Sequence, residues 1–206
     1  MKFKPVMRGL ALAVGMFPTF VHVAQASWLD GARAMFAPSP IAELYFLPPP
    51  DLTTLLPPQD GLTEAWLLAQ PEPTGDEQWQ CLKEAVYFES RGESLLGQIA
   101  VAEVILNRVD SPLYPGTVCG VVKQRGGGSC QFSYVCDGYA DRMREKAAAD
   151  LAGRIARAML DGAPRILTDG ATHFHTRNVR PGWARSFPKT AAIGAHLFYR
   201  HPDTRG

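Results

Sequence analysis

The chain has 206 residues, of which 46% are hydrophobic and 20% charged, and its formal net charge is +1. This length suits one domain of ordinary size, and the apolar content excludes a wholly disordered protein. The near-neutral charge argues against a dedicated nucleic-acid-binding protein, because such proteins present a strongly basic face.

Residues 1–26 have the three-part layout of an export signal. Three basic residues precede an apolar run from Gly9 to Phe20, and Ala24-Gln25-Ala26 follows just before Ser27. The run is shorter than the roughly 20 residues that span a bilayer, and Pro18 interrupts it. We therefore predict a cleaved signal peptide, a periplasmic or cell-envelope location, and no stable membrane anchor after cleavage.

Residues 27–75 form an acidic, proline-rich leader. They hold nine of the 17 prolines and carry a net charge of −5, whereas residues 76–206 carry +3. Proline removes backbone donors and blocks helix interiors, so we expect an extended tether ahead of a catalytic domain at 76–206. The alternative is that two short apolar islands, Leu44–Leu47 and Ala65–Leu68, dock onto the folded domain or a regulatory protein partner.

Hydrophobic periodicity predicts a mostly helical α+β domain with a small antiparallel sheet. Apolar residues recur three and four apart in the helical segments and alternate in the last segments. His173 and His175 then share one face of a strand. The expected elements are helices over residues 77–90, 95–109 and 141–160, a long loop over 110–139, and paired strands at 171–176 and 196–200.

The four cysteines, Cys81, Cys119, Cys130 and Cys136, predict disulfides rather than metal ligands in an exported chain. Three pairings are possible, and the sequence does not choose among them. Pairing Cys130 with Cys136 closes a small loop and leaves Cys81 with Cys119, which links the first helix to the segment after the second. A structural zinc site is disfavoured because paired Cys-x-x-Cys spacing is absent.

The most informative stretch is Ala85-Val86-Tyr87-Phe88-Glu89-Ser90-Arg91-Gly92-Glu93. If the helix continues through it, Glu89 and Glu93 lie four apart on one face. A carboxyl partly removed from water has a raised pKa and keeps its proton near neutral pH, as a general acid requires. By spacing alone, an ordinary solvated pair with Arg91 as counter-ion fits as well.

The wider pattern resembles the SleB/CwlJ-type cell wall hydrolase family, whose best-known members are spore cortex-lytic enzymes. The resemblance covers about residues 80–200 and implies a lysozyme-like or lytic-transglycosylase-like domain that cuts peptidoglycan glycan strands, with Glu89 as the acid. The leader has no counterpart to the N-terminal repeat domain of some spore enzymes, and a role in germination does not carry over. The matching segments begin with Cys81–Glu93, Gly97–Ala102, Leu106–Val109 and Tyr114-Pro115, and continue with Val118–Val122, Cys130–Ser133, Cys136–Gly138, Ala171–His175 and Ile193–Arg200.

The chemistry allows two routes across the bond between N-acetylmuramic acid and N-acetylglucosamine. Hydrolysis with two carboxylates needs a second acid, for which Glu93 or Asp137 are the candidates. A lytic transglycosylase uses the sugar's own 6-hydroxyl as nucleophile, so one carboxyl serves as acid and then as base. We favour the lytic route, with Glu93 tuning or assisting Glu89 and no cofactor.

Several side chains are candidates for sugar contacts. Gln98, Gln131 and Ser133 offer hydrogen bonds to acetamido groups, and Tyr87, Phe132 and Trp183 offer flat faces to sugar rings. In the alternative interpretation, Phe132 and Trp183 belong to the core and Gln98 braces a helix.

Two other classes of function remain open. One is a zinc-dependent amidase or peptidase that uses His173 and His175 with His196 or His201, although no His-Glu-x-x-His is present. The other is a non-catalytic wall-binding protein, in which Glu89 is structural and the leader mediates interactions.

Overall fold

The computed structural model describes residues 56–204. The predicted signal peptide, residues 27–55 of the leader and the Leu44–Leu47 island lie outside these residues. Within the described part of the chain, no helix is both long enough and apolar enough to cross a membrane.

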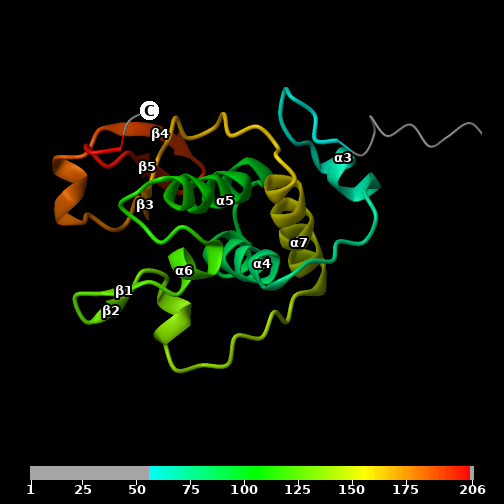
Figure 1. The fold of residues 1–206 in the computed structure, drawn as a ribbon, viewed down its shortest axis with the longest axis horizontal. Helices are drawn as coiled ribbons and strands as arrows, with labels where there is room; N and C mark the ends of the chain where they lie inside the picture. The colour runs from blue at the N-terminus through cyan, green and yellow to red at the C-terminus, as the bar shows by residue number, and fades with distance from the viewer. Residues whose placement is uncertain (1–55, 205–206) are drawn as a thin grey trace, which may run out of the picture. The chain divides into compact units, whose positions relative to one another are not determined.

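Three helices form the centre of the fold (Figure 1): α4 (Glu77–Ser90), α5 (Leu95–Asp110) and α7 (Lys146–Leu160). The side chains of Asp76 and Ser94 cap α4 and α5 by accepting hydrogen bonds from the backbone N–H groups of Trp79 and Gly97. These two helices lie where the sequence predicts them. The third prediction was wrong at its start, because the helix begins at Lys146 rather than Asp141. Met143 packs against the core from outside the helix, and the hydroxyl of Tyr87 accepts the hydrogen bond of the Glu145 N–H just ahead of it.

The predicted loop over residues 110–139 contains short elements that the sequence analysis missed. They are α6 (Val118–Val122), the hairpin of β1 (Arg125–Gly126) and β2 (Ser129–Cys130), and the 3-10 helix η2 (Ser133–Cys136). None exceeds five residues, so none shows a periodicity. Gly127 and Gly128 form the hairpin turn with positive φ values of 61° and 85°.

The disulfides pair Cys81 with Cys119 and Cys130 with Cys136. This is the arrangement in which one bridge closes a small loop and the other joins two helical segments. The bridge between Cys81 and Cys119 holds α4 to α6, and the bridge between Cys130 and Cys136 holds β2 to η2.

A three-stranded antiparallel sheet follows α7, in the order β3-β5-β4. Its strands are β3 (His173–Thr176), β4 (Lys189–Ile193) and β5 (His196–Tyr199). His173 pairs with Tyr199 and His175 with Leu197, which confirms the predicted pairing of the two strand segments. The sequence analysis missed β4. The predicted fold class, a mostly helical α+β domain with a small antiparallel sheet, is confirmed.

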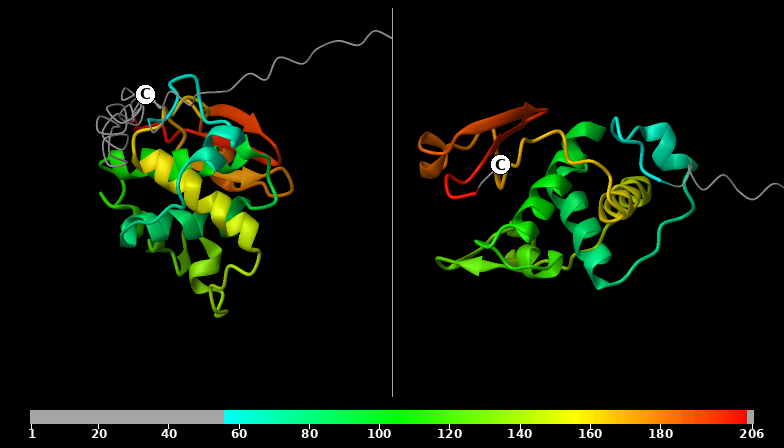
Figure 2. Two further views of the ribbon diagram at one scale, coloured as in Figure 1. Left: turned by 90° about the vertical axis from the view of Figure 1, so that its right-hand side faces the viewer. Right: turned by 45° about the horizontal axis from the view of Figure 1, so that its top comes forward.

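Figure 2 shows the sheet against one side of α5 and α3 (Glu64–Ala69) against α7. The side chain of Leu67 on α3 is fully buried. Arg154 of α7 donates hydrogen bonds to the carbonyls of Leu67 (3.0 Å) and Gln70 (2.6 Å). The packed part of the chain therefore begins before Asp76, and the Ala65–Leu68 island docks on the domain rather than forming part of an extended tether.

We expect Leu67→Ala to lower the free energy of unfolding by roughly 2–3 kcal/mol, because it leaves a cavity under α3. The neighbouring Leu68 is 55% exposed, so Leu68→Ala is a matched control that should change stability by less than about 0.5 kcal/mol. Urea unfolding measures both. Equal losses would mean that α3 does not pack on the domain.

Candidate active site

Glu89 lies in the last turn of α4, partly buried. Burial raises the pKa of its carboxyl from 4.5 to about 7, and the positive charge of Arg108 acts in the opposite direction. The carbonyl end of the helix also disfavours a negative charge at this position. Glu89 is therefore a carboxyl that holds or releases a proton near neutral pH.

Arg108 reaches this region from α5 and is 1% exposed. Its Nε donates to the carbonyl of Thr172 at 2.6 Å, and its guanidinium lies over the rings of Tyr114 (5.4 Å) and Phe132 (5.6 Å). Burial lowers the pKa of Arg108 to about 10, against the influence of Tyr114 and Glu89, so it stays charged near neutral pH. Its Nη1 is buried and has no hydrogen-bond partner among the described residues.

Polar side chains of α5 fix the segment that leads into β3. The buried carboxylate of Glu103 accepts hydrogen bonds from the backbone N–H groups of Leu167 (3.0 Å) and Thr168 (2.8 Å). Asn107, one turn further along, donates to the carbonyl of Ala171 at 2.9 Å. These contacts set the position of Thr172, and with it that of Arg108.

Tyr134 of η2 provides a second buried polar group near Glu89. Its ring stacks on Phe88, with ring centroids 4.7 Å apart. Burial raises the pKa of the phenol, and nearby carboxyls including Glu84 and Glu89 act in the same direction, so the phenol keeps its proton. Its OH is buried without a partner among residues 56–204. A protonated phenol and a free guanidinium N–H can both donate to a carboxylate or a ligand.

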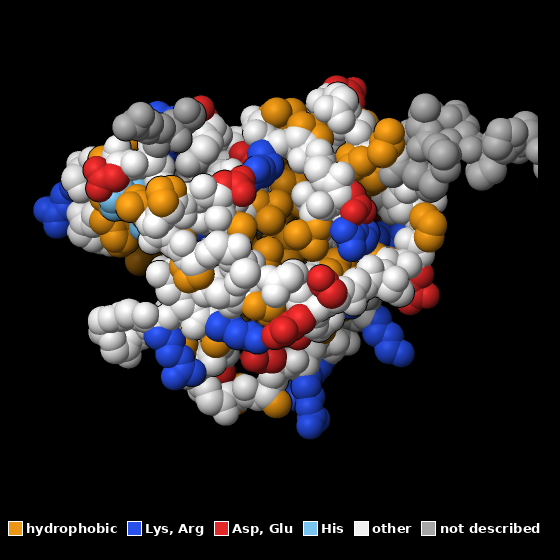
Figure 3. Space-filling view, viewed as in Figure 1, with side chains coloured by type: hydrophobic (Ala, Val, Ile, Leu, Met, Phe, Trp, Pro, Cys, Tyr) orange, Lys and Arg blue, Asp and Glu red, His pale blue; other side chains and the backbone are white. Residues whose placement is uncertain are grey.

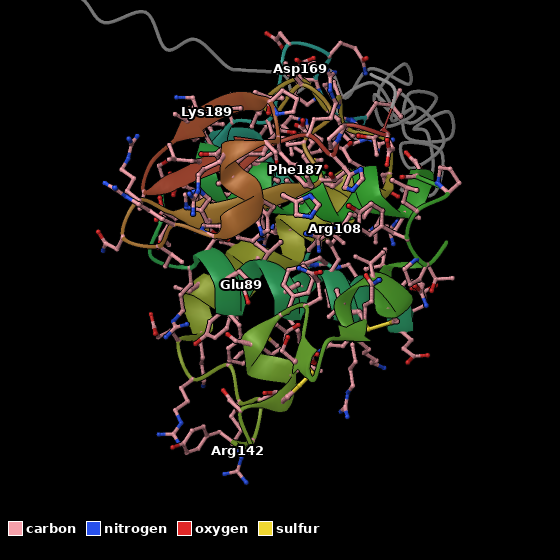
Figure 4. The ribbon with its side chains drawn as sticks, turned by 90° about the vertical axis from the view of Figure 1, so that its left-hand side faces the viewer. Glu89, Arg108, Arg142, Asp169, Phe187 and Lys189 are labelled. Atoms are coloured by element: carbon pink, nitrogen blue, oxygen red, sulfur yellow. A yellow bond between two sulfur atoms is a disulfide. The ribbon has the colours of Figure 1, made fainter. Side chains whose placement is uncertain are left out.

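An aromatic cluster lies on the side of Arg108 that faces away from Glu89. His173 contacts Trp183 of the 3-10 helix η3 (Gly182–Arg185) and Phe187, with ring centroids 4.9 Å apart in both pairs. Burial lowers the pKa of His173 to about 4, and the positive charge of Arg108 and the neighbouring His201 act in the same direction. Its imidazole is therefore neutral near pH 7. Figure 3 shows a notch between the lobe that carries η3 and the projecting β1–β2 hairpin. Figure 4 faces that side, and Phe187, Arg108 and Glu89 follow one another down it.

The structure separates Glu93 from Glu89. The helix ends at Ser90, so the condition for placing both glutamates on one helical face is not met. The Oε2 atom of Glu93 accepts a hydrogen bond from the N–H of Ala195 at 3.0 Å, and Oε1 lies 3.7 Å from Nδ1 of His196. Glu93 therefore ties the α4–α5 turn to the β4–β5 turn.

The close approach of Glu93 requires glycine at position 194. Gly194 has φ +56°, and a Cβ there would overlap Oε2 of Glu93. We expect Gly194→Ala to cost roughly 2–3 kcal/mol of stability, from backbone strain and the displaced hydrogen bond. Gly182 has open space around its Cα, so Gly182→Ala is the control. Thermal unfolding that gave equal midpoints for the two variants would contradict this role of Glu93.

Tyr87 and Gln98, two predicted sugar contacts, are 3% and 5% exposed. The hydroxyl of Tyr87 accepts from the N–H of Glu145, and Nε2 of Gln98 donates to the carbonyl of Glu93 at 3.1 Å. Both side chains are held within the fold, and Gln98 braces the α4–α5 turn. Phe132 is also buried, beneath Arg108, as the alternative interpretation expected.

Gln131 and Ser133 are exposed and lie on either side of the buried Phe132. Trp183 is half-buried in the aromatic cluster. Asp137 is exposed, and its carboxylate accepts a hydrogen bond from the N–H of Tyr139 at 2.8 Å. The exposed Gln131 and Ser133 remain open to a ligand.

The four histidines that the structure describes do not converge on a three-ligand metal site. His173 and His175 both contact Trp183 and so share a face of β3, as predicted. His196 is buried against Phe174, on the other face of the sheet. Within residues 56–204, the one group of three potential ligand atoms close to one another is Glu77, Cys81 and Cys119, and both of its sulfurs are in a disulfide. This geometry disfavours the zinc alternative.

A family model described as Cell Wall Hydrolase matches residues 92–199, more than half of the chain. The chain belongs to the cell wall hydrolase family. This confirms the resemblance found in the sequence motifs. Glu89 lies three residues before the matched segment.

Curated relatives of this cell wall hydrolase are spore cortex-lytic enzymes. That of Halalkalibacterium halodurans is 36% identical over 130 residues, which cover 62% of this chain and 36% of the enzyme. That of Oceanobacillus iheyensis is 33% identical over 135 residues, covering 62% and 43%. The chain thus spans about two fifths of the length of the curated relatives it matches.

Solved structures with similar sequence include the catalytic domain of the germination-specific lytic transglycosylase SleB from Bacillus anthracis. It is 32% identical, with a TM-score of 0.49, and the match covers 64% of this chain and all of that one. The catalytic domain of Bacillus cereus SleB is 33% identical with the same TM-score, and the match covers 63% and 94%.

Arg108 lies in the matching segment Leu106–Val109, but the sequence analysis assigned no role to it. A usable signal was present, because Arg108 interrupts a helix that is apolar on most sides, and a buried cation needs partners. Tyr134 carried no such signal. Its position depends on η2, which was not predicted.

Proposed function

We propose that this cell wall hydrolase cleaves peptidoglycan glycan strands between N-acetylmuramic acid and N-acetylglucosamine, with Glu89 as the proton donor. The observation that carries the proposal is the partly buried Glu89 carboxyl, whose pKa of about 7 keeps much of it protonated at neutral pH. Membership of the family and the names of its relatives, cortex-lytic enzymes and a lytic transglycosylase, support this substrate.

In the proposed reaction, Glu89 first gives its proton to the glycosidic oxygen. The bond from C1 of muramic acid to that oxygen breaks, and an oxocarbenium-like centre forms. The ionised Glu89 then takes the proton of the muramic acid 6-hydroxyl as that oxygen bonds to C1. The product is a 1,6-anhydro sugar, no water is consumed, and Glu89 ends with its proton restored.

The lytic route is supported by the surroundings of the candidate second carboxyls. Glu93 accepts a hydrogen bond from the N–H of Ala195, and Asp137 accepts one from the N–H of Tyr139. One carboxyl is enough when the sugar supplies its own nucleophile. Arg108 remains charged and stabilises the ionised form of Glu89 between the two steps.

We further propose that Gln131 and Ser133 contact the acetamido groups from the lower side of the notch and that Trp183 contacts the sugar from the upper side. Glu93 acts as a positioning residue. The predicted signal peptide would deliver the protein to the periplasm or cell envelope, where wall remodelling needs it. The leader upstream of residue 56 is the proposed region for a regulatory partner.

Digestion of purified peptidoglycan followed by mass spectrometry tests the proposal. Fragments lighter by one water than ordinary reducing muropeptides are the expected product. Ordinary reducing ends would contradict the lytic route and require a second carboxylate. Free stem peptides whose release stops in chelator would favour the zinc amidase, and binding without release would favour the wall-binding protein.

A further inference from the structure

The net positive charge of the domain is concentrated in residues 171–200, which we call the basic lobe. This segment holds five basic residues and no acidic one, whereas residues 76–170 hold eleven basic and thirteen acidic residues. It contains β3, η3, β4 and β5. The lobe therefore presents an excess of positive charge that the rest of the domain lacks.

Three of these cations have no partner within the described part of the chain. Arg180, Arg185 and Lys189 are exposed and form neither an ion pair nor a side-chain hydrogen bond with any described residue. By contrast, Arg177 donates to the carbonyl of Gly194 at 3.4 Å, and Arg200 lies 4.0 Å from Asp169. Exposed cations of one segment that lack counter-ions attract an external anion.

The lobe also adjoins the candidate active site. Arg185 belongs to η3, the same short helix that places Trp183 against His173. His173 in turn lies within the electrostatic reach of Arg108, which acts on Glu89. Figure 4 shows Lys189, Phe187, Arg108 and Glu89 in succession on one side of the molecule. An anion at the basic lobe would thus be carried by a polymer that also reaches Glu89.

We propose that Arg180, Arg185 and Lys189 bind the carboxylates of the stem peptides attached to the glycan strand. The inference rests on the proposed function and narrows its substrate to peptide-bearing strands. The sugar rings are uncharged, and each lactyl-linked peptide carries free carboxylates, so the peptides are the source of negative charge on the strand. A cation at the rim of a binding site acts on affinity and association rate rather than on the chemical step.

Binding to two glycan preparations tests the inference independently of cleavage. One preparation carries stem peptides. The other has been stripped of them by an amidase, and the lactyl carboxylates that the amidase uncovers have been converted to neutral methyl amides. All proteins carry Glu89→Gln so that strands stay intact. The test variant adds Arg180→Gln, Arg185→Gln and Lys189→Gln. The control adds Arg142→Gln, Arg144→Gln and Lys146→Gln, three exposed cations without ion pairs among the described residues; Arg142 lies at the opposite end of the view in Figure 4.

We expect the parent protein to bind peptide-bearing strands about tenfold more tightly than stripped strands at low salt, and the test variant to lose this preference. The control should keep it, and salt should reduce it. Equal binding of both strands by the parent would overturn the inference, as would an equal loss in the control. If vesicles of anionic phospholipid displaced peptide-bearing and stripped strands equally well, the result would assign the basic lobe to a lipid surface instead.

Cleavage by the protein with Glu89 intact separates this inference from the proposed function. If the inference holds, the test substitutions raise KM on peptide-bearing strands about tenfold and leave kcat unchanged. Cleavage of both strands with equal KM would reject only the role of the basic lobe. Binding preference without any cleavage would reject the proposed activity and leave the basic lobe as a wall-binding surface.

Discussion

Replacing Glu89 by Gln is expected to lower the rate of glycan-strand cleavage by roughly 10²–10⁴-fold, because the amide has no proton to donate to the leaving oxygen. The two side chains have nearly the same shape, so the fold and strand binding should persist. The loss should therefore appear in kcat, with KM little changed. Turbidity loss of purified peptidoglycan, with fragments identified by mass spectrometry, measures the rate.

The control for this variant is Glu84→Gln, the same chemical change on the same helix. Glu84 accepts a hydrogen bond at 2.7 Å from Gln80, which lies one turn earlier on the same helix. We expect its activity to stay within about twofold of the parent, because the amide keeps the shape of this half-buried side chain and can still accept the hydrogen bond from Gln80. Residual cleavage by Glu89→Gln equal to that of Glu84→Gln would show that another group donates the proton.

Arg108→Met should affect both stability and the pH dependence of cleavage. It leaves the carbonyl of Thr172 without its donor and removes the guanidinium between Tyr114 and Phe132. We expect a loss of roughly 3–4 kcal/mol of unfolding free energy. Since Arg108 lowers the pKa of Glu89, its removal should raise that pKa above 7 and slow the first step, because a weaker acid gives its proton less readily to the leaving oxygen.

Arg108→Lys separates the two effects. Lysine keeps a positive charge but cannot reproduce the planar guanidinium between two rings. We expect Arg108→Lys to lose stability while its pH profile stays close to that of the parent. A pH profile that shifts equally in both variants would contradict an electrostatic role for Arg108 toward Glu89.

The elements that the sequence predicted well are those with local signals. Asp76 caps α4, and the apolar spacing within Glu77–Ser90 marks its buried face, so both bounds were readable. The alternation in β3 predicted that His173 and His175 share a face, and the register with β5 confirms the strand pairing. The short helix α6 has only five residues and is fixed by the bridge from Cys119 to Cys81. The spacing of apolar residues within so short a segment does not predict a helix that a distant disulfide fixes.

The candidate site shows the same division. Glu89 was found from a local motif, and its partial burial agrees with the raised pKa that the motif suggested. Glu93 was assigned beside it on an uninterrupted helix, yet its hydrogen bond goes to Ala195, 102 residues away. Arg108 also acts through distant partners, at Thr172 and on Glu89. The spacing of residues along the chain does not predict these contacts between distant segments.

The central claim is that burial keeps the Glu89 carboxyl protonated near neutral pH so that it can act as an acid. The most direct test is a carboxyl-carbon NMR titration of the protein, with Glu89→Gln used to assign the resonance, beside the pH dependence of kcat/KM. We predict that Glu89 titrates at about 7 and that kcat/KM falls about tenfold per pH unit above the same value. A Glu89 resonance that titrates near the ordinary value of 4.5 would contradict the account.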